Sequence, residues 1–219
     1  MGDRTRKTVF AAMFLAAAMN ATVAAAASFD CAQALSATER LICSDASLGA
    51  RDVILSRLYV AAIRKDPTGR IKAGQREWLA KAGTCGTAAC LGKMYEGQID
   101  RLLRTKGGNA AASHFFTEEP KGNHGTLDVV GPTDGFAYVS LVSTYVGPGG
   151  VEGGNVNVGN TAAFVDLREG RAEFTDFGTR HDGGCIVTVN RIDVDHWKVD
   201  QRGSCDLSWG TLFAGTYQR

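Results

Sequence analysis

The six cysteines constrain the fold of this sequence more than any other feature. They are Cys31, Cys43, Cys85, Cys90, Cys185 and Cys205. An even set of cysteines indicates structural disulfides if the chain is exported, because compartments outside the cytoplasm are oxidising. Zinc is the alternative, but zinc sites prefer close cysteine pairs, and Cys85-x4-Cys90 is wide and has no second close pair. We therefore expect disulfides, and no metal or cofactor.

The N-terminal residues are typical of a cleavable signal peptide. Basic residues lie within 4–7, an apolar stretch spans 9–19, and an alanine run occupies 24–27. This order of basic, apolar and small residues is that of a secretory signal. The apolar stretch is too short for a membrane span, so an uncleaved N-terminal anchor is the weaker alternative. We predict a signal peptide over residues 1–27, with cleavage after Ala27.

The mature chain is expected to be periplasmic or secreted and to carry no lipid. A lipid anchor would need a cysteine directly after the cleavage site, but the first cysteine, Cys31, follows Ser28-Phe29-Asp30. Cleavage changes the net charge from +1 to −1, because residues 1–27 hold three basic residues and one acidic residue. A nearly neutral surface favours neither nucleic acid nor an anionic membrane as partner. The oligomeric state stays open.

The chain changes character near residue 106. Before this point, apolar residues recur at the spacing of one helix face, as in Leu91, Met94, Tyr95, Gln98, Ile99, Leu102 and Leu103. Beyond Gly125 the sequence is glycine-rich, β-branched and alternating, which indicates short strands. We predict an α+β protein in two domains: a disulfide-stapled helical bundle over 28–105, a flexible linker over 106–122, and an antiparallel β sandwich or barrel over 123–219.

Four cysteines of the helical part allow three pairings. We favour Cys31–Cys43 and Cys85–Cys90, because each closes a short loop and is therefore compatible with many arrangements of the helices. A helical part of roughly 75 residues is small enough to need such staples. The connectivity itself stays open, since sequence does not determine it.

The β part contains eight candidate strands. They are Thr126–Val130, Phe136–Tyr145, Asn155–Val158, Ala162–Leu167, Ala172–Phe177, Cys185–Ile192, Trp197–Gln201 and Leu212–Tyr217. Residues 168–171 are expected to form a tight hairpin turn, in which Gly170 is free to adopt a positive φ.

A turn centred on Asp195 would pair the last two long strands, so that opposed residue numbers sum to 390. Cys185 would then face Cys205 across the hairpin, at a separation that a disulfide can span. The same register places Val189 opposite Gln201.

No catalytic constellation is evident. No serine has the G-x-S-x-G context of a nucleophile elbow, and a fully paired cysteine set provides no thiol nucleophile. The histidines, at 114, 124, 181 and 196, do not have the spacing of helix-borne metal ligands. Paired carboxylates for glycoside hydrolysis are defined only in space, and nothing singles out a pair. We expect a binding protein rather than an enzyme.

The glycine-rich stretch 147–155 is the most unusual local feature. It lacks the Lys-Ser/Thr ending of a phosphate-binding loop. One interpretation is a mobile loop between strands. The other is a protruding loop that enters a partner's cleft, since loops on a rigid scaffold often carry recognition.

Several segments of the helical part follow one another at the spacing of a known pattern. They are Phe29-Asp30-Cys31-Ala32, Glu39–Asp45, Leu48, Asp52, Tyr59, Gln75–Leu79, Cys85, Cys90, Leu91, Tyr95, Ile99 and Leu103. Over residues 29–104 the chain resembles the N-terminal domain of the LprI-like lysozyme-inhibitor family of exported bacterial proteins. It departs from that family at Ala82, where members usually carry an arginine. Tyr59, Trp78, Leu79 and Tyr95 are expected in the core, and Arg76 could pair with Asp52.

The resemblance implies a periplasmic inhibitor of a lysozyme-type muramidase. Such an enzyme has a cleft with two carboxylates, so an inhibitor needs only a loop that fills the cleft and donates hydrogen bonds. The candidate partner-binding residues are Gly149, Gly150, Glu152, Arg180, His181 and Arg76. The alternatives are a non-inhibitory envelope module that binds a protein or a cell-wall component and, third, a hydrolase.

Overall fold

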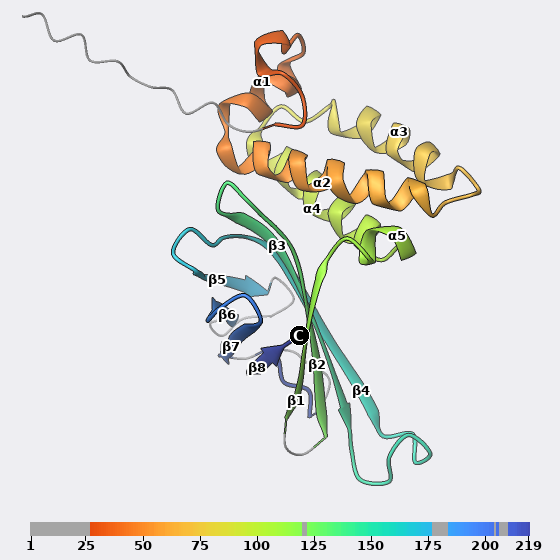
Figure 1. The fold of residues 1–219 in the computed structure, drawn as a ribbon, viewed down its shortest axis with the longest axis vertical. Helices are drawn as coiled ribbons and strands as arrows, with labels where there is room; N and C mark the ends of the chain where they lie inside the picture. Colours follow the sequence, from red (N-terminus) through yellow and green to blue (C-terminus); the bar gives the residue numbers. More distant parts are fainter. Residues whose placement is uncertain (1–26, 120–121, 177–183, 204, 206–209) are drawn as a thin grey trace, which may run out of the picture.

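A computed structural model describes residues 27–119, 122–176, 184–203, 205 and 210–219. Helices form the first part of the chain and an eight-stranded antiparallel sheet forms the second (Figure 1). The helical elements are η1 (Cys31–Gln33), α1 (Ala37–Ser44), α2 (Ala46–Arg64), α3 (Arg70–Ala82), α4 (Ala88–Leu103) and α5 (Lys106–Asn109). The signal peptide expected over 1–27 lies outside the described residues except for Ala27.

Side chains that accept backbone hydrogen bonds cap the starts of α1, α2 and α4. Ser36 and Glu39 form a reciprocal capping box at the start of α1, with Glu39 N donating to Ser36 Oγ at 3.1 Å. The Asp45 carboxylate caps α2 by accepting from the backbone amides of Ser47 and Leu48. Thr87 does the same for α4. These short-range bonds follow directly from the sequence.

The helical core forms along the apolar faces of α2 and α4. Its fully buried side chains include Ile54, Leu58, Leu91, Ile99 and Leu102. Trp78 and Tyr95 are buried there as expected, with their rings 5.1 Å apart in an edge-to-face contact. Tyr59 is half-buried. The expectation for Leu79 is wrong, because this side chain is 56% exposed on α3.

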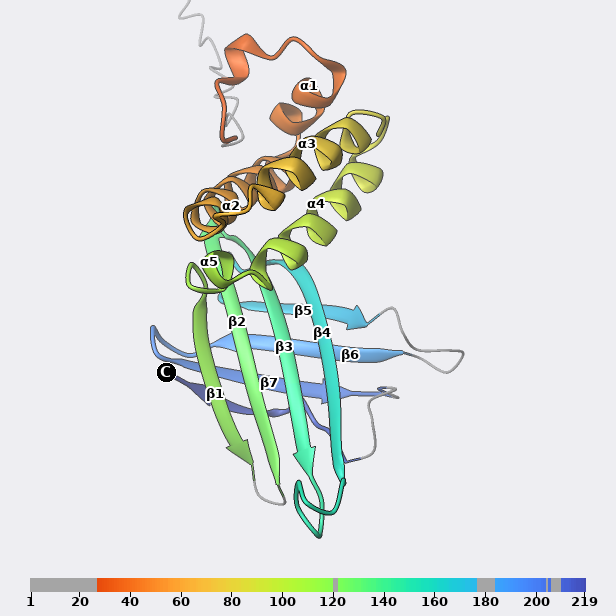
Figure 2. The same cartoon turned by 90° about the vertical axis from the view of Figure 1, so that its right-hand side faces the viewer.

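The eight strands are hydrogen-bonded in the order β4-β3-β2-β1-β8-β7-β6-β5. Their bounds are β1 Ser113–Glu119, β2 Asn123–Thr133, β3 Phe136–Val146, β4 Val156–Asp166, β5 Arg171–Asp176, β6 Cys185–Arg191, β7 His196–Arg202 and β8 Gly215–Gln218. In Figure 2 the long strands β1–β4 run roughly at right angles to β5–β8. Leu127, Val139, Val187, Val199 and Tyr217 fill the space between the two halves. The sheet is therefore barrel-like and nearly closed.

The region predicted as a flexible linker, 106–122, is instead structured where it is described. It contains α5 and β1. Gly107 in α5 lies so close to α2 that an added Cβ would be 2.2 Å from the Ala61 carbonyl oxygen. The glycines that suggested flexibility thus permit close helix packing.

Two details of the predicted strands are also corrected. Asn155–Val158 and Ala162–Leu167 belong to one strand, β4, which pairs with β3 along its whole length. Gly170 has the expected positive φ of 72°, but the turn it forms does not make a hairpin. It joins β4 to β5, which lie at the two ends of the hydrogen-bonded order.

The six cysteines form three disulfides, and the pairs are those favoured from the sequence: Cys31–Cys43, Cys85–Cys90 and Cys185–Cys205. The predicted register between β6 and β7 is nevertheless wrong by two residues, since Val189 pairs with Val199 and not with Gln201. The cause is Asp193, whose carboxylate accepts from the amides of Asp195 and His196 and centres the turn one residue earlier. The third disulfide therefore lies beyond the last paired residues of this ladder.

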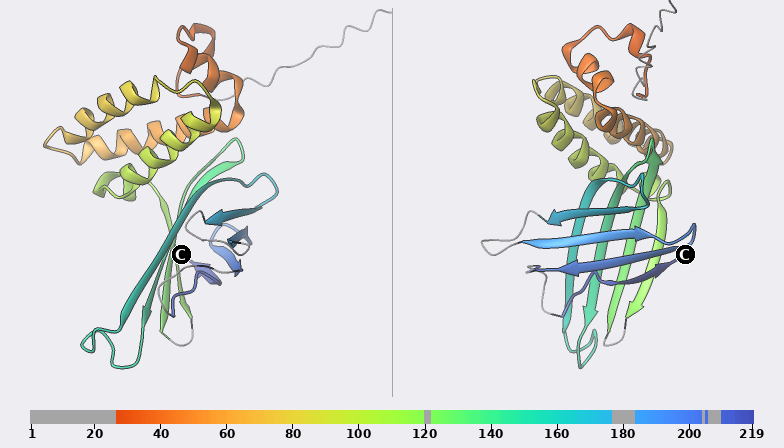
Figure 3. Two further views of the ribbon diagram at one scale, coloured as in Figure 1. Left: turned by 180° about the vertical axis from the view of Figure 1, so that it is seen from behind. Right: turned by 90° about the vertical axis from the view of Figure 1, so that its left-hand side faces the viewer.

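The helices pack against one end of the sheet, as the views in Figure 3 also show. Val130 of β2 and Tyr138 of β3 are buried in the helical core. A second contact joins α2 to β4, the strand next to β3. The Arg51 guanidinium of α2 lies 3.8 Å from the centre of the Phe164 ring of β4, and it also pairs with Glu96 at 2.6 Å. Helices and sheet are thus joined by packing as well as by the chain.

Candidate functional site

The first candidate site is the tip of the β3–β4 hairpin, residues 147–155, which we call the tip. Eleven consecutive residue pairs join β3 and β4 up to Val146 and Val156. The hairpin carries the tip to the end of the molecule opposite the helices (Figure 2). A long paired hairpin of this kind is a rigid support for a recognition loop.

The tip has turns of its own. The Gly147 amide donates to the Asn155 carbonyl at 2.9 Å, the Gly153 amide to Gly149 at 3.0 Å, and the Gly154 amide to Val151 at 3.1 Å. Gly149, Gly150 and Gly154 have positive φ values, which other residues adopt rarely. These turns are consistent with the interpretation as a protruding loop.

At the apex the side chain of Val151 is 74% exposed. Next to it Glu152, also exposed, is the only charged residue of the tip. Within the described part of the chain, the backbone amides of Val151 and Glu152 donate to no acceptor. The apex of the tip thus presents an apolar side chain, a carboxylate and two N–H groups that have no acceptor among the described residues.

The structure does not bring all the predicted partner-binding residues together. Gly149, Gly150 and Glu152 lie in the tip, whereas Arg76 lies on α3 at the opposite end of the molecule. Arg180 and His181 lie outside the described residues. Of the candidate hydrogen-bond donors, Arg76 therefore does not form one surface with the tip.

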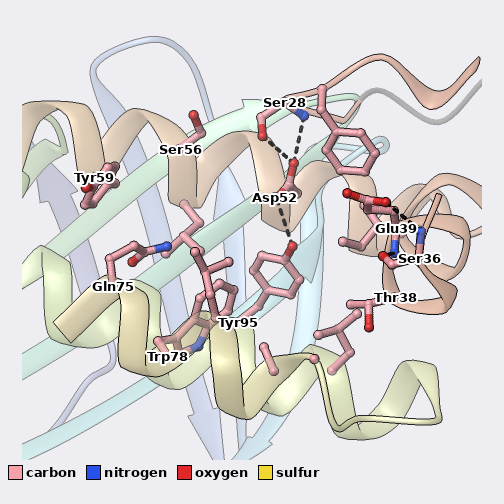
Figure 4. Close-up of a pocket in the computed structure, with 17 residues that line it drawn as sticks. Ser28, Ser36, Thr38, Glu39, Asp52, Ser56, Tyr59, Gln75, Trp78 and Tyr95 are labelled. Atoms are coloured by element: carbon pink, nitrogen blue, oxygen red, sulfur yellow. Dashed lines mark hydrogen bonds between the residues drawn. The ribbon is translucent and has the colours of Figure 1, made fainter. Parts of the chain in front are cut away.

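The second candidate site is a groove in the helical part that the sequence analysis missed. The N-terminal segment, α1, α2, α3 and α4 enclose a cavity of about 490 Å³ (Figure 4). Its aromatic and apolar lining includes Phe29, Ile42, Leu55, Tyr59, Trp78, Leu79 and Tyr95. Its polar lining includes Ser28, Ser36, Thr38, Glu39, Asp52, Ser56 and Gln75. We call this cavity the groove.

Asp52 links three segments in the lining of the groove (Figure 4). Its Oδ1 accepts from the Tyr95 hydroxyl at 2.8 Å, and its Oδ2 accepts from the Ser28 amide at 2.7 Å and the Ser28 hydroxyl at 2.5 Å. Burial, and then the negative charge of Asp52, raise the pKa of Tyr95, so the phenol stays protonated and keeps donating. The ion pair expected between Asp52 and Arg76 is replaced by these bonds.

Glu39, the other carboxylate of the groove, is committed to the helix cap. The backbone amides of Ser36 and Leu35 donate to it at 2.8 and 2.9 Å, and these bonds hold its pKa below the ordinary value. A carboxylate with a lowered pKa cannot act as a general acid near neutral pH. Glu39 is therefore poorly suited to act as a general acid in the groove.

A third hollow, of about 310 Å³, lies at one end of the barrel and is lined by three arginines. Each guanidinium already has a partner within the protein. Arg168 pairs with Asp166, Arg219 pairs with Asp195 at 3.7 Å, and Arg191 donates to the Asp193 carbonyl at 3.2 Å. These contacts offset the positive charge and leave less of it for an anionic ligand.

Comparison with known proteins adds no relative. No protein-family model, curated protein or solved structure matches the chain. Over the described residues, no group of three or more potential metal-ligating side chains is present. None of the helices described is both long enough and apolar enough to cross a membrane.

Proposed function

We propose that this protein is exported and inhibits a lysozyme-type muramidase by placing the tip in the enzyme's substrate cleft. The observation that carries the proposal is the tip itself, a turn-closed loop on a long hairpin with an exposed valine at its apex. The choice of muramidase as partner comes from the resemblance of residues 29–104 to LprI-like inhibitors.

The shape of the tip supports insertion into a cleft. A loop that is already closed by its own hydrogen bonds loses less conformational entropy on binding than an unstructured one. Burial of the Val151 side chain in a partner would contribute roughly 1.5 kcal/mol. This is a modest anchor, so backbone contacts along the tip must supply the remaining affinity.

The charge of the tip constrains how it can bind. A muramidase cleft contains two carboxylates. The free amides of Val151 and Glu152 can donate to them, and the flanking glycines allow the backbone to approach closely. Glu152 would have to point away from the enzyme carboxylates, because like charges repel at short range.

The test is a titration of cell-wall lysis with oxidised protein against c-type and g-type lysozymes. The proposal predicts loss of activity at a nearly stoichiometric ratio, and a Val151→Asp variant that inhibits at least tenfold less well. Val194→Asp is the matched control, since Val194 is 58% exposed in the β6–β7 turn, away from the tip. No inhibition by the unsubstituted protein at large excess would overturn the proposal.

The groove supports a second candidate function, a non-inhibitory envelope module that binds a peptide or cell-wall fragment. The specific observation is the aromatic lining with Leu79 exposed at its edge. This function predicts that soluble peptidoglycan fragments bind without any effect on lysozyme, and that Leu79→Asp weakens that binding while Val151→Asp does not. Fragment binding unaffected by Leu79→Asp would argue against the groove.

A further inference from the structure

We infer that Asp52 is the binding site for the N-terminal ammonium group of the processed chain, which cleavage between Ala27 and Ser28 would create in the lining of the groove. The inference rests on the predicted cleavage site and on the geometry around Asp52. It does not depend on the proposed binding to a muramidase.

The geometry is already that of an amine-binding site. The Ser28 nitrogen lies 2.7 Å from Asp52 Oδ2, within the range of a charge-assisted hydrogen bond. The Ser28 hydroxyl donates to the same oxygen, and the Tyr95 hydroxyl holds the other. The carboxylate is therefore fixed by two elements and aimed at the atom that cleavage would charge.

The charge balance of the groove gives a second, independent reason. Its described lining contains two carboxylates, Asp52 and Glu39, and no lysine, arginine or histidine. In the unprocessed chain the group facing Asp52 Oδ2 is a neutral amide. A partly buried carboxylate without a cation is costly, and an ammonium at Ser28 would supply the missing positive charge.

The chemical step is hydrolysis of one peptide bond by a signal peptidase. Water adds across the bond, so that Ala27 receives the hydroxyl and Ser28 receives a hydrogen. At neutral pH the new carboxyl releases a proton and the new amine takes one up. The Ser28 nitrogen thus changes from an amide with one hydrogen into an ammonium with three, and it remains next to Asp52.

Processing would then also shape the groove. Ser28 and Phe29 line it, and their position depends on the bond to Asp52 and on the nearby Cys31–Cys43 disulfide. An ammonium held by Asp52 would keep this segment closed over α2 and α4. Asp52 is the group bonded to the Ser28 nitrogen, and the other charged or titratable groups that line the groove in the described chain are Glu39, Tyr59 and Tyr95.

The pH dependence has a definite sign. An α-amino group has an ordinary pKa of about 8, and pairing with a carboxylate raises it in the folded state. The stabilisation is therefore complete below about pH 8, the unfolded-state value, and is lost as pH rises through the higher folded-state pKa.

The first measurement is the N-terminal sequence of the protein purified after export. The inference predicts that it begins at Ser28. The effect of Asp52→Asn on thermal unfolding at pH 7 is then measured in two forms of the protein. One form is the processed chain, and the other begins at Ala26. We expect Asp52→Asn to lower the Tm by about 2–4 °C more in the processed chain, with the excess disappearing near pH 10.

An N-terminus at another residue, or an equal effect of Asp52→Asn in both chains, would overturn the inference. If the Asp52→Asn variant does not fold, a second measurement tests the inference. It is the α-amino pKa of the unsubstituted processed protein, obtained by NMR or from the pH dependence of amine acetylation. A value raised above about 8 supports the ammonium site, whereas an ordinary value contradicts it.

Discussion

Tyr95 and Asp52 illustrate what single residues do in the helical part. The Tyr95 ring is 2% exposed and packs against Trp78, while its hydroxyl reaches Asp52 on α2, 43 residues away in sequence. The same residue therefore contributes both apolar packing and a polar link between α2 and α4. Both residues line the groove.

Tyr95→Phe is expected to destabilise the protein by about 1–2 kcal/mol, because it leaves Asp52 Oδ1 without its buried donor while the ring packing stays. The free energy of unfolding in urea measures the effect. Tyr59→Phe is the matched control: Tyr59 lines the same groove, half-buried, and no hydrogen bond of its hydroxyl is found in the described chain. Equal losses for the two variants would contradict the role given to the Tyr95–Asp52 bond.

Glu152 provides a residue-scale test of the proposed binding mode. If the tip enters a cleft that contains two carboxylates, the Glu152 charge opposes binding. Glu152→Gln should then lower the inhibition constant for c-type lysozyme by about 2–5-fold, most clearly at low ionic strength where screening is weak. A variant that inhibits less well would mean that Glu152 contacts a positive group, and the proposed mode would be wrong.

At the scale of elements, the sequence predicted what local chemistry determines. The apolar face of α4 and the positive φ of Gly170 follow from neighbouring residues and were predicted. The helix caps at Ser36 and Asp45 also depend on neighbouring residues, but they were not predicted. The β6–β7 register was missed because the Asp193 side chain shifted the turn. The position of the turn depends on which of its acidic residues accepts the backbone hydrogen bonds, and the sequence pattern did not identify that residue.

Tertiary packing explains what the sequence did not predict. Gly107 was interpreted as part of a linker. A glycine is needed there because the chain closely approaches the Ala61 backbone, and this contact joins residues far apart in sequence. The groove was missed for the same reason, since its lining comes from five segments that meet only in the folded chain. The tip was found because its glycines lie close together in the sequence.

Gly107→Ala tests this explanation of α5. A Cβ at this position meets backbone atoms of α2, so we expect a loss of about 1–3 kcal/mol in the free energy of unfolding. Gly97→Ala is the control, because Gly97 lies in α4 with nothing within 4 Å of the added Cβ. That change should stabilise the protein by up to about 1 kcal/mol, since alanine favours helix. Similar effects at both positions would contradict the packing role of Gly107.

At the scale of the whole molecule, the two candidate sites lie at opposite ends. The groove belongs to the helices, the tip ends the long β3–β4 hairpin, and the sheet lies between them (Figure 2). Val130 and Tyr138 connect the sheet to the helical core, so the helices are held in place relative to the hairpin. This separation allows the two functions to be distinguished in one experiment.

Hydrogen exchange of the oxidised protein, alone and with excess c-type lysozyme, is that experiment. Our account predicts slower exchange confined to the amides of residues 145–157, with the helical part unchanged. The free amides of Val151 and Glu152 should show the largest slowing, because they have no acceptor in the unbound protein's described residues. Protection in the groove without protection at the tip, or no protection anywhere, would contradict inhibition through the tip.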